Sequence, residues 1–334
     1  MLSLALSLAV SAASCTGLAK LAVADTTIAA AEMVSRGAFR PPAAGRAPSA
    51  EMFSAFDRLP PFCRVQAVVA PSPGSHIELE VWLPASDWNG RLLGAGNGGY
   101  GGSISYTRLG EAVDNGYAGV STDTGHKAAS SRDAQWATGH PERQADFDHR
   151  AVHAMTVVAR AAIRAFYGRP PDHAYFNACS NGGRQGLMEA ERYPGDYDGI
   201  MAGAPAIDLG FRTFPTGDLD AFRKRGGKLI LYHGGNDAPR RSIDYYGRLP
   251  RAREFAQLYV VPGMGHCGSG DVPNDVGQWL RPGADSRHSL LKALERWVER
   301  GVAPQSVIAT QYKRDGDVAS GVLRERTIRP RPGH

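Results

Sequence analysis

The sequence of 334 residues contains no run of about 20 apolar residues outside its first residues, and that is the length a transmembrane helix requires. It also has no Cys-x-x-Cys pair, no Gly-Lys-Ser/Thr phosphate-binding segment and no basic block interleaved with aromatic residues. The first absence argues against a membrane-spanning protein. The others argue against a zinc or dithiol redox site, a P-loop and a nucleic-acid groove.

The composition is that of an ordinary globular protein, with 43% hydrophobic and 21% charged residues. The formal net charge of +5 comes from arginines scattered along the chain, so we interpret it as a contribution to solubility. The Arg-rich C-terminal residues 324–331 are predicted to form a frayed end. The length allows one large α/β domain or two small ones.

Residues 1–13 form an apolar, small-residue segment that ends in Ser-Ala-Ala. This segment is typical of a secretory signal, although a positively charged start is missing, and it is too short to span a bilayer. We therefore expect a secreted or periplasmic protein, with residues 14–334 as a single catalytic domain. No feature of the sequence fixes the oligomeric state.

Short apolar runs alternate with segments of helical periodicity along most of the chain. Alternating strands and helices predict a mostly parallel sheet with helices on both faces, and in such sheets the functional loops follow the carboxyl ends of the strands. One predicted strand, 77–83, alternates apolar and polar residues, so we expect it to have one solvated face. The predicted strands are 77–83, 91–94, 118–122, 174–177, 199–204, 228–233 and 255–261, and the predicted helices are 142–167, 183–193 and 287–300.

Ser180 lies in a Gly-rich turn between a predicted strand and a predicted helix. Ala178 and Gly182 stand two positions to either side, so the segment matches the nucleophile-elbow pattern G-x-S-x-G with alanine at the first glycine. The elbow strains the backbone of the serine and requires small neighbours. A helix cap in an ordinary turn is the structural alternative, but the position between strand and helix favours a nucleophile.

Asp237 and His266 each follow a later predicted strand, and the chain order Ser180, Asp237, His266 is that of an α/β-hydrolase triad. The carboxylate would orient the imidazole, which would accept the serine proton. An Asx turn and a structural histidine are the alternatives. Asp244 is a second candidate acid, within a predicted helix.

Three other histidines are weaker candidates for the base. His149 and His153 share one face of a predicted long helix and are expected to be structural or solvated. His126 follows a predicted strand, where loop packing explains it as well as a place in the site.

The Gly-rich segment 96–102 follows a predicted strand, where the hydrolase fold places an oxyanion-hole loop. Backbone N–H groups of Gly98 and Gly99, together with that of Asn181 after the nucleophile, are the candidate donors.

Four cysteines, an even number in a predicted exported protein, indicate disulfides rather than free thiols. Three pairings are possible. We favour Cys15–Cys63 and Cys179–Cys267, because Cys179 and Cys267 adjoin the serine and histidine of the predicted triad. A lipid-modified Cys15 is disfavoured by Ala12, where a large aliphatic residue would be expected.

These segments resemble the tannase and feruloyl esterase family, which also includes a mono(hydroxyethyl) terephthalate hydrolase. The resemblance covers about residues 15–323, and its motifs lie at 96–100, 121–126, 139–142, 179–185, 198–206, 233–237 and 262–267. It implies the α/β-hydrolase fold, the triad Ser180, Asp237 and His266, and bridges Cys179–Cys267 and Cys15–Cys63. It also implies an extracellular or periplasmic esterase of small aromatic-acid esters.

The chain departs from the family pattern in three places. The family's lid domain, which carries calcium, would insert near residues 206–217, where this chain has only a short connection, so we expect no calcium and no other cofactor. The segment after Asp237 is shorter than usual, and the family's C-terminal cysteine is missing. The leading hypothesis is a lidless serine esterase of feruloyl- or galloyl-like esters, and the alternative is a catalytically impaired paralogue that binds phenolic ligands.

Overall fold

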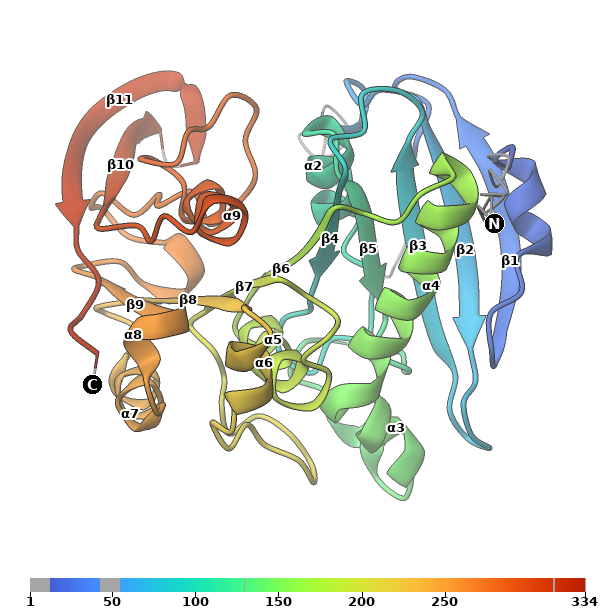
Figure 1. Cartoon of the computed structure of the whole chain (residues 1–334), viewed down its shortest axis with the longest axis horizontal. Coiled ribbons are helices and arrows are strands. Elements are labelled where there is room, and N and C mark those ends of the chain that lie inside the picture. The colour runs from blue at the N-terminus through green and yellow to red at the C-terminus, as the bar shows by residue number, and fades with distance from the viewer. Residues whose placement is uncertain (1–12, 43–54, 129, 315, 334) are drawn as a thin grey trace, which may run out of the picture.

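The computed structural model describes residues 13–42, 55–128, 130–314 and 316–333. The predicted signal segment lies outside these residues except for Ala13. The strands of the described chain form one nine-stranded sheet in the order β1-β2-β3-β5-β4-β6-β7-β8-β9 and a separate hairpin, β10-β11 (Figure 1). Their bounds are β1 (Thr26–Val34), β2 (Phe62–Val69), β3 (Ile77–Pro84), β4 (Arg91–Ala95), β5 (Ala118–Thr122), β6 (His173–Cys179), β7 (Gly199–Gly203), β8 (Lys228–Gly234), β9 (Ala256–Val261), β10 (Val307–Arg314) and β11 (Asp317–Ile328).

The sheet is antiparallel at its N-terminal edge and parallel through the rest. β1, β2, β3 and β5 pair antiparallel, whereas β5, β4, β6, β7, β8 and β9 pair parallel. Parallel neighbours need a crossover between them, and helices provide most of these crossovers. The predicted mostly parallel sheet flanked by helices is therefore confirmed, and the carboxyl ends of β6, β8 and β9 lie at one edge.

The helices cover both faces of this sheet. Long helix α4 packs on β3, β4 and β5, while α9 packs on β7 and β8 (Figure 1). No helix in the described part of the chain is both long and apolar enough to cross a membrane. The helical elements are η1 (Thr16–Lys20), α2 (Tyr106–Asp114), η2 (Gln135–Ala137), α3 (Pro141–Ala145), the π-helical turn η3 (Asp146–Arg150), α4 (Ala151–Tyr167), α5 (Asn181–Arg192), α6 (Asp220–Lys224), α7 (Arg240–Arg248), α8 (Ala252–Phe255), η4 (His266–Gly268) and α9 (Leu290–Arg300).

Strand β8 shows how its sequence fills two cores. Successive side chains of a strand point to opposite faces, so a strand buried on both faces is apolar throughout. Leu229 and Leu231 enter the core that contains α4, whereas Ile230 and Tyr232 enter the core that contains α9. The apolar run 229–232 thereby fixes β8 between the two cores, next to the edge strand β9.

Two helix boundaries follow from capping chemistry. Gly168, with φ 72°, ends α4 in the left-handed conformation that glycine adopts without a steric penalty. The Ser289 side chain accepts a hydrogen bond from the Lys292 N–H at the start of α9, so this helix begins three residues later than predicted.

Most of the solvated face expected for residues 77–83 is covered, so that prediction holds only for Glu78, whose side chain is 39% exposed. Glu80 is only 1% exposed, because an aromatic cluster that includes Phe39 and Trp82 covers this side of β3. Its carboxylate accepts hydrogen bonds from Arg64 at 2.6 and 2.8 Å and from the Trp82 indole at 2.8 Å. The alternation of residue types therefore marks a buried ion pair rather than contact with water.

The frayed end expected at residues 324–331 is also wrong for most of its length. β11 runs to Ile328 and pairs antiparallel with β10, with Arg324 opposite Gln311 and Arg326 opposite Ala309. Ile328 is buried with Val307, so two apolar residues at the base of the hairpin fix a strand that is otherwise polar.

Candidate functional site

Ser180 is the single residue between β6 and α5. Its backbone has φ 63° and ψ −125°, a strained conformation for a residue other than glycine. The Ser180 N–H donates to the Gly203 carbonyl at 2.9 Å, and the Ser180 carbonyl accepts from the Ala206 N–H at 3.0 Å. These two bonds tie the strained residue to the end of β7 and hold its side chain at the carboxyl edge of the sheet.

The small neighbours of Ser180 are a steric requirement of this turn. A Cβ atom added to Gly182 would lie 2.5 Å from the Cβ of Ala178, closer than side-chain atoms approach. A Cβ added to Gly96 would lie 2.9 Å from both the Ala178 Cβ and the Gly182 Cα. Strand β6, the Ser180 turn and the Gly-rich loop can therefore meet only because these positions carry alanine and glycine.

His266 and Asp237 contact each other across the ends of β9 and β8. His266 Nδ1 lies 2.6 Å from Asp237 Oδ2. The imidazole is about half exposed, at 52%, and the carboxylate is 23% exposed. A carboxylate that accepts the Nδ1 proton leaves Nε2 as the acceptor nitrogen of a neutral ring, which is the tautomer a general base requires.

Backbone hydrogen bonds join the turn that carries Asp237 to the turn that carries His266. The Asn236 N–H donates to the Met264 carbonyl at 3.0 Å, and the Gly235 N–H donates to the Val261 carbonyl at 2.8 Å. Asp237 also closes a tight turn through its N–H to the Gly234 carbonyl. These backbone hydrogen bonds therefore hold Asp237 in place.

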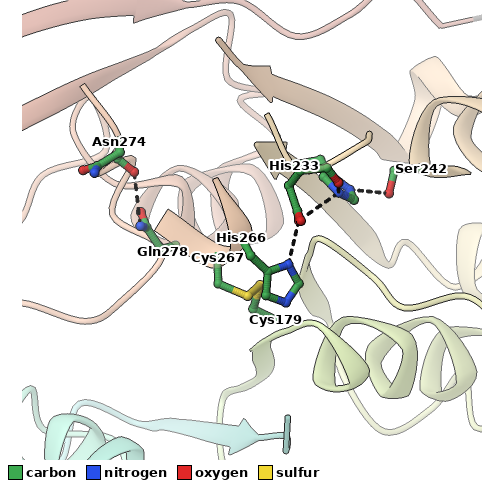
Figure 2. The surroundings of a disulfide bond; sticks show 8 residues. Cys179, His233, Ser242, His266, Cys267, Asn274 and Gln278 are labelled. Carbon is green, nitrogen blue, oxygen red and sulfur yellow. Dashed lines mark hydrogen bonds and ion pairs between the residues drawn. A yellow bond between two sulfur atoms is a disulfide. The ribbon is translucent and has the colours of Figure 1, made fainter. Parts of the chain in front are cut away.

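Both predicted disulfides are present in the structure. Cys15 is bonded to Cys63, and Cys179 is bonded to Cys267 beside His266 (Figure 2). A ring nitrogen of His266 and the two sulfur atoms of the second bridge lie within 4.8 Å of one another. Because these sulfurs are bonded to each other, they are not the thiolates that a metal ion would need.

The structure brings Asp237 and His266 into contact but shows no hydrogen bond from the Ser180 hydroxyl to His266 among the described residues. Catalytic hydrogen bonds are often long in unliganded enzymes and shorten when substrate binds. The Cys179–Cys267 bridge keeps the Cα atoms next to these two residues 6.0 Å apart. Ser180 and His266 are therefore neighbours through their flanking cysteines.

The second candidate acid lies elsewhere. Asp244, on α7, makes an ion pair with Arg240 at 2.8 Å, and its side chain is 46% exposed. Within the part of the chain that the structure describes, Asp244 contacts no histidine, whereas Asp237 contacts two. The geometry thus favours Asp237 over Asp244 as partner of His266.

The three other candidate histidines have partners outside the Ser180 turn. Buried His126 stacks on Trp136 with ring centroids 3.5 Å apart, and its Nε2 lies 2.8 Å from the Tyr100 carbonyl. His149 bonds the Tyr193 hydroxyl and His153 bonds Asp196. Burial lowers the pKa of His149 to about 4, so it is neutral at physiological pH.

The Gly-rich loop lies against the start of α5. A Cβ on Gly182 would come within 3.4 Å of the Asn97 nitrogen, and the Asn97 N–H already donates to the Gln185 side chain at 3.1 Å. Among the described residues, the N–H groups of Gly98 and Asn181 donate to no protein acceptor. Gly99, with φ 55°, packs against the Ser131 carbonyl. The N–H groups of Gly98 and Asn181 therefore remain candidate oxyanion donors, and Asn181 lies at the N-terminus of α5.

Arg184 has a structural role that sequence reasoning did not assign. Fully buried, it donates to the Asn181 side chain at 2.8 Å and to the carbonyls of Asp148 and Phe147 at 2.9 and 3.0 Å. Burial lowers its pKa to about 10, so it still carries its charge at neutral pH. The guanidinium therefore fixes the first turn of α5 to the π-helical turn before α4.

Asp148 likewise carries a role that the sequence did not indicate. Its carboxylate accepts the N–H groups of Phe211, Arg212 and Thr213 at 2.8 to 3.0 Å. These residues lie in the connection 204–219, which leads from β7 to α6 without a helix or strand. Buried Asp148 thus holds the middle of this connection, and Glu191 accepts the N–H groups of Thr216 and Gly217 nearer its end. The π-helical geometry that aims Asp148 at it has no simple sequence signature.

Comparisons with known proteins agree with this architecture. A family model described as tannase and feruloyl esterase matches residues 63–217 and 212–332. A probable feruloyl esterase B-1 of Aspergillus fumigatus is 38% identical, over 77% of this chain and 80% of the relative. The crystal structure of feruloyl esterase B from Aspergillus oryzae superposes with a TM-score of 0.83 at 22% identity, over 95% of each chain, which supports the α/β-hydrolase fold.

An uncharacterized esterase of Xanthomonas campestris pv. campestris is 26% identical, over 97% of this chain and 88% of its own length. That alignment spans 519 positions, more than the 334 residues of this chain, so the relative contains segments that have no counterpart here. The two parts of the family match meet at residues 212–217, within the connection that Asp148 holds. The chain belongs to the tannase and feruloyl esterase family, whose members are carboxylic ester hydrolases.

Proposed function

We propose that this protein is a serine esterase in which Ser180 is the nucleophile, His266 the general base and Asp237 the acid that orients it. The observation that carries the proposal is the 2.6 Å bond between His266 Nδ1 and Asp237 Oδ2, next to a disulfide that adjoins the strained Ser180. A structural histidine would explain the bond but not the strained serine beside it.

In this mechanism Ser180 Oγ attacks the ester carbonyl while His266 Nε2 accepts its proton. The backbone N–H groups of Asn181 and Gly98 or Gly99 stabilise the oxyanion, helped by the positive end of the α5 dipole. His266 then gives the proton to the leaving alcohol, and an acyl-enzyme forms at Ser180. Water activated by the same imidazole hydrolyses that ester and regenerates the enzyme.

The proposed substrates are small esters of phenolic or aromatic acids, of the feruloyl or galloyl type. Support comes from the relatives, several of which are named feruloyl esterases. His266 is about half exposed, and the connection 204–219 adds no domain over the site. Such an open site admits varied esters but excludes water poorly, so we expect modest turnover and broad specificity.

The proposed reaction uses no cofactor or metal, calcium included, and involves neither nucleic acid nor membrane. We further propose that the protein works outside the cytoplasm, in a secreted or periplasmic form. Two disulfides support this location, because disulfides form and persist in oxidising compartments.

Hydrolysis of methyl ferulate, methyl gallate and p-nitrophenyl acetate by the purified protein tests the proposal, with Ser180→Ala as the matched variant. The expected result is hydrolysis that the variant loses, together with labelling of Ser180 by a fluorophosphonate probe. Unchanged hydrolysis by the variant would rule out Ser180 as nucleophile. Saturable binding of methyl ferulate without turnover would instead favour the impaired paralogue that binds phenolic ligands.

A further inference from the structure

A second histidine lies behind the acid of the proposed site. His233, in β8, is only 6% exposed, and its Nε2 lies 3.0 Å from the Asp237 carbonyl and 3.2 Å from Asp237 Oδ2 (Figure 2). On the other side of the ring, Nδ1 lies 2.8 Å from the hydroxyl of Ser242, on α7. Ser242 is fully buried. Asp237 Oδ2 is therefore shared by two imidazoles, His233 from the interior and His266 from the surface.

The partners of His233 fix its protonation. Both Asp237 oxygens are acceptors, so Nε2 must carry the proton, and Nδ1 then accepts from the Ser242 hydroxyl. Burial is the main influence on this ring and lowers its pKa, while Asp237 raises it and His266 lowers it. His233 is thus a neutral donor, and it adds no charge to the site.

The hydrogen bonds of His233 act on the acid in two ways. The bond to the Asp237 carbonyl anchors a turn in which Ala238 has a positive φ of 50°. The bond to Oδ2 fixes the position of the carboxylate oxygen that also accepts the Nδ1 proton of His266. From this shared oxygen we infer that His233 is a positioning residue of the proposed esterase, which orients Asp237 toward His266.

This role suits the short acid loop of this chain. Asp237 lies only four residues after His233, and Pro239 and helix α7 follow at once. A side chain on a short, strained turn has few other supports, and His233 provides one from a rigid strand. A side chain that supports a catalytic residue in this way keeps the hydrogen-bond geometry within the small tolerance that proton transfer requires.

The inference rests on the proposed function, and two substitutions at one position test it. His233→Leu removes the donor at similar bulk, whereas His233→Gln can place an amide N–H near the position of Nε2. For His233→Leu we expect kcat to fall up to roughly 100-fold with little change in KM, because the acid is misplaced. We also expect the acid limb of the kcat/KM profile to move, because the position of the carboxylate that pairs with the protonated base changes.

His233→Gln should restore most of kcat and the native pH profile. Ser242→Ala removes the bond to Nδ1 but leaves the Nε2 donor, so it should lose less activity than His233→Leu and leave the acid limb in place. A residue that only packs would give equal losses in His233→Leu and His233→Gln and an unmoved acid limb. That pattern, or a folded His233→Leu variant with native kcat and profile, would overturn the inference.

A second readout does not depend on turnover. In a Ser180→Ala background, the NMR resonance of the His266 Nδ1 proton should shift in His233→Leu and keep its position in His233→Gln. If His233→Leu fails to fold, His233→Asn, whose shorter amide does not reach the position of Nε2, takes its place in both readouts. Absence of any esterase activity in the parent overturns the proposed function, whereas an active parent with an unmoved resonance in the folded variant that lacks the Nε2 donor overturns only the role of His233.

Discussion

The Cα atoms of Cys179 and Cys267 lie 6.0 Å apart although 88 residues separate them along the chain. One cysteine precedes Ser180 and the other follows His266, so the bond links the turn that carries Ser180 directly to the turn that carries His266. The Cys15–Cys63 bridge closes 48 residues at the far end of the sheet and touches neither turn. Removing each bridge in turn can therefore distinguish an effect on stability from an effect on activity.

Replacing Cys179 and Cys267 together by alanine should lower the free energy of unfolding by roughly 4 to 5 kcal/mol in the chain-entropy model. Replacing Cys15 and Cys63 together by alanine should lower it by roughly 4 kcal/mol. Only the first pair should also reduce kcat in protein that remains folded, because only it holds the proposed catalytic turns together. Denaturant unfolding and esterase assays on both double variants measure this. Equal kcat losses would show that the bridge acts through stability alone.

Asp237→Asn should reduce kcat by on the order of 10³- to 10⁴-fold, because an amide cannot stabilise the imidazolium and favours the wrong tautomer of His266. Asp244→Asn is the control, since it removes an exposed ion pair with Arg240 and should leave kcat within about twofold. Steady-state kinetics at saturating p-nitrophenyl acetate would show the contrast. A larger loss in the Asp244 variant would move the acid role to α7.

Glu189 should make the protein less stable as pH rises. Burial in α5 raises the pKa of this carboxyl well above its usual value, with a further contribution from Asp196, so the folded state keeps a proton that the unfolded state has lost. Between about pH 4.5 and the raised value, stability falls by up to about 1.4 kcal/mol per pH unit. Glu189→Gln should therefore be more stable than the parent at pH 8, with a smaller advantage at pH 5.

Urea unfolding of the parent and Glu189→Gln proteins at several pH values tests this, with Asp114→Asn at the end of α2 as a control for an exposed charge. A stability difference that does not grow with pH would contradict a protonated Glu189. So would an equal pH trend in the control.

Asp148→Ala should loosen the connection 204–219, because three N–H groups lose a charged acceptor. We expect faster amide hydrogen exchange at Phe211, Arg212 and Thr213 and a loss of roughly 2 to 4 kcal/mol of stability. Asp208→Asn, which removes an exposed ion pair to Arg241 in the same segment, should leave exchange at these residues nearly unchanged. Unaltered exchange in the Asp148 variant would mean that other contacts hold the segment.

Much of the fold could be predicted because its signals are local. The apolar run 229–232, the helical spacing before Gly168 and the small residues around Ser180 each identify an element within about ten residues of sequence. The proposed site shares this property, since its three residues each follow a strand whose end is visible in the sequence. The pairing of four cysteines could be chosen only because two of them adjoin those residues.

The features that the sequence did not show depend on distant contacts. Glu80 resembles a solvated residue until the aromatic cluster and Arg64 from another strand are placed around it. Arg324 resembles part of a loose tail until β10 pairs with it. The roles of Asp148, Arg184 and His233 come from hydrogen bonds to partners that periodicity cannot reveal, because each bond joins elements that meet only in the folded chain.

The hydrogen bonds from three N–H groups to Asp148 also have a consequence for the evolution of such proteins. Thr213 is bonded to Asp148 in the helix layer, and Ala206 is bonded to the Ser180 carbonyl. The connection is therefore attached to the main domain on both sides of residues 207–212. Lengthening a loop between fixed ends costs little entropy, and exposed loops accept whole inserted domains. An inserted domain can therefore be gained or lost in this connection during evolution while the sheet keeps its fold.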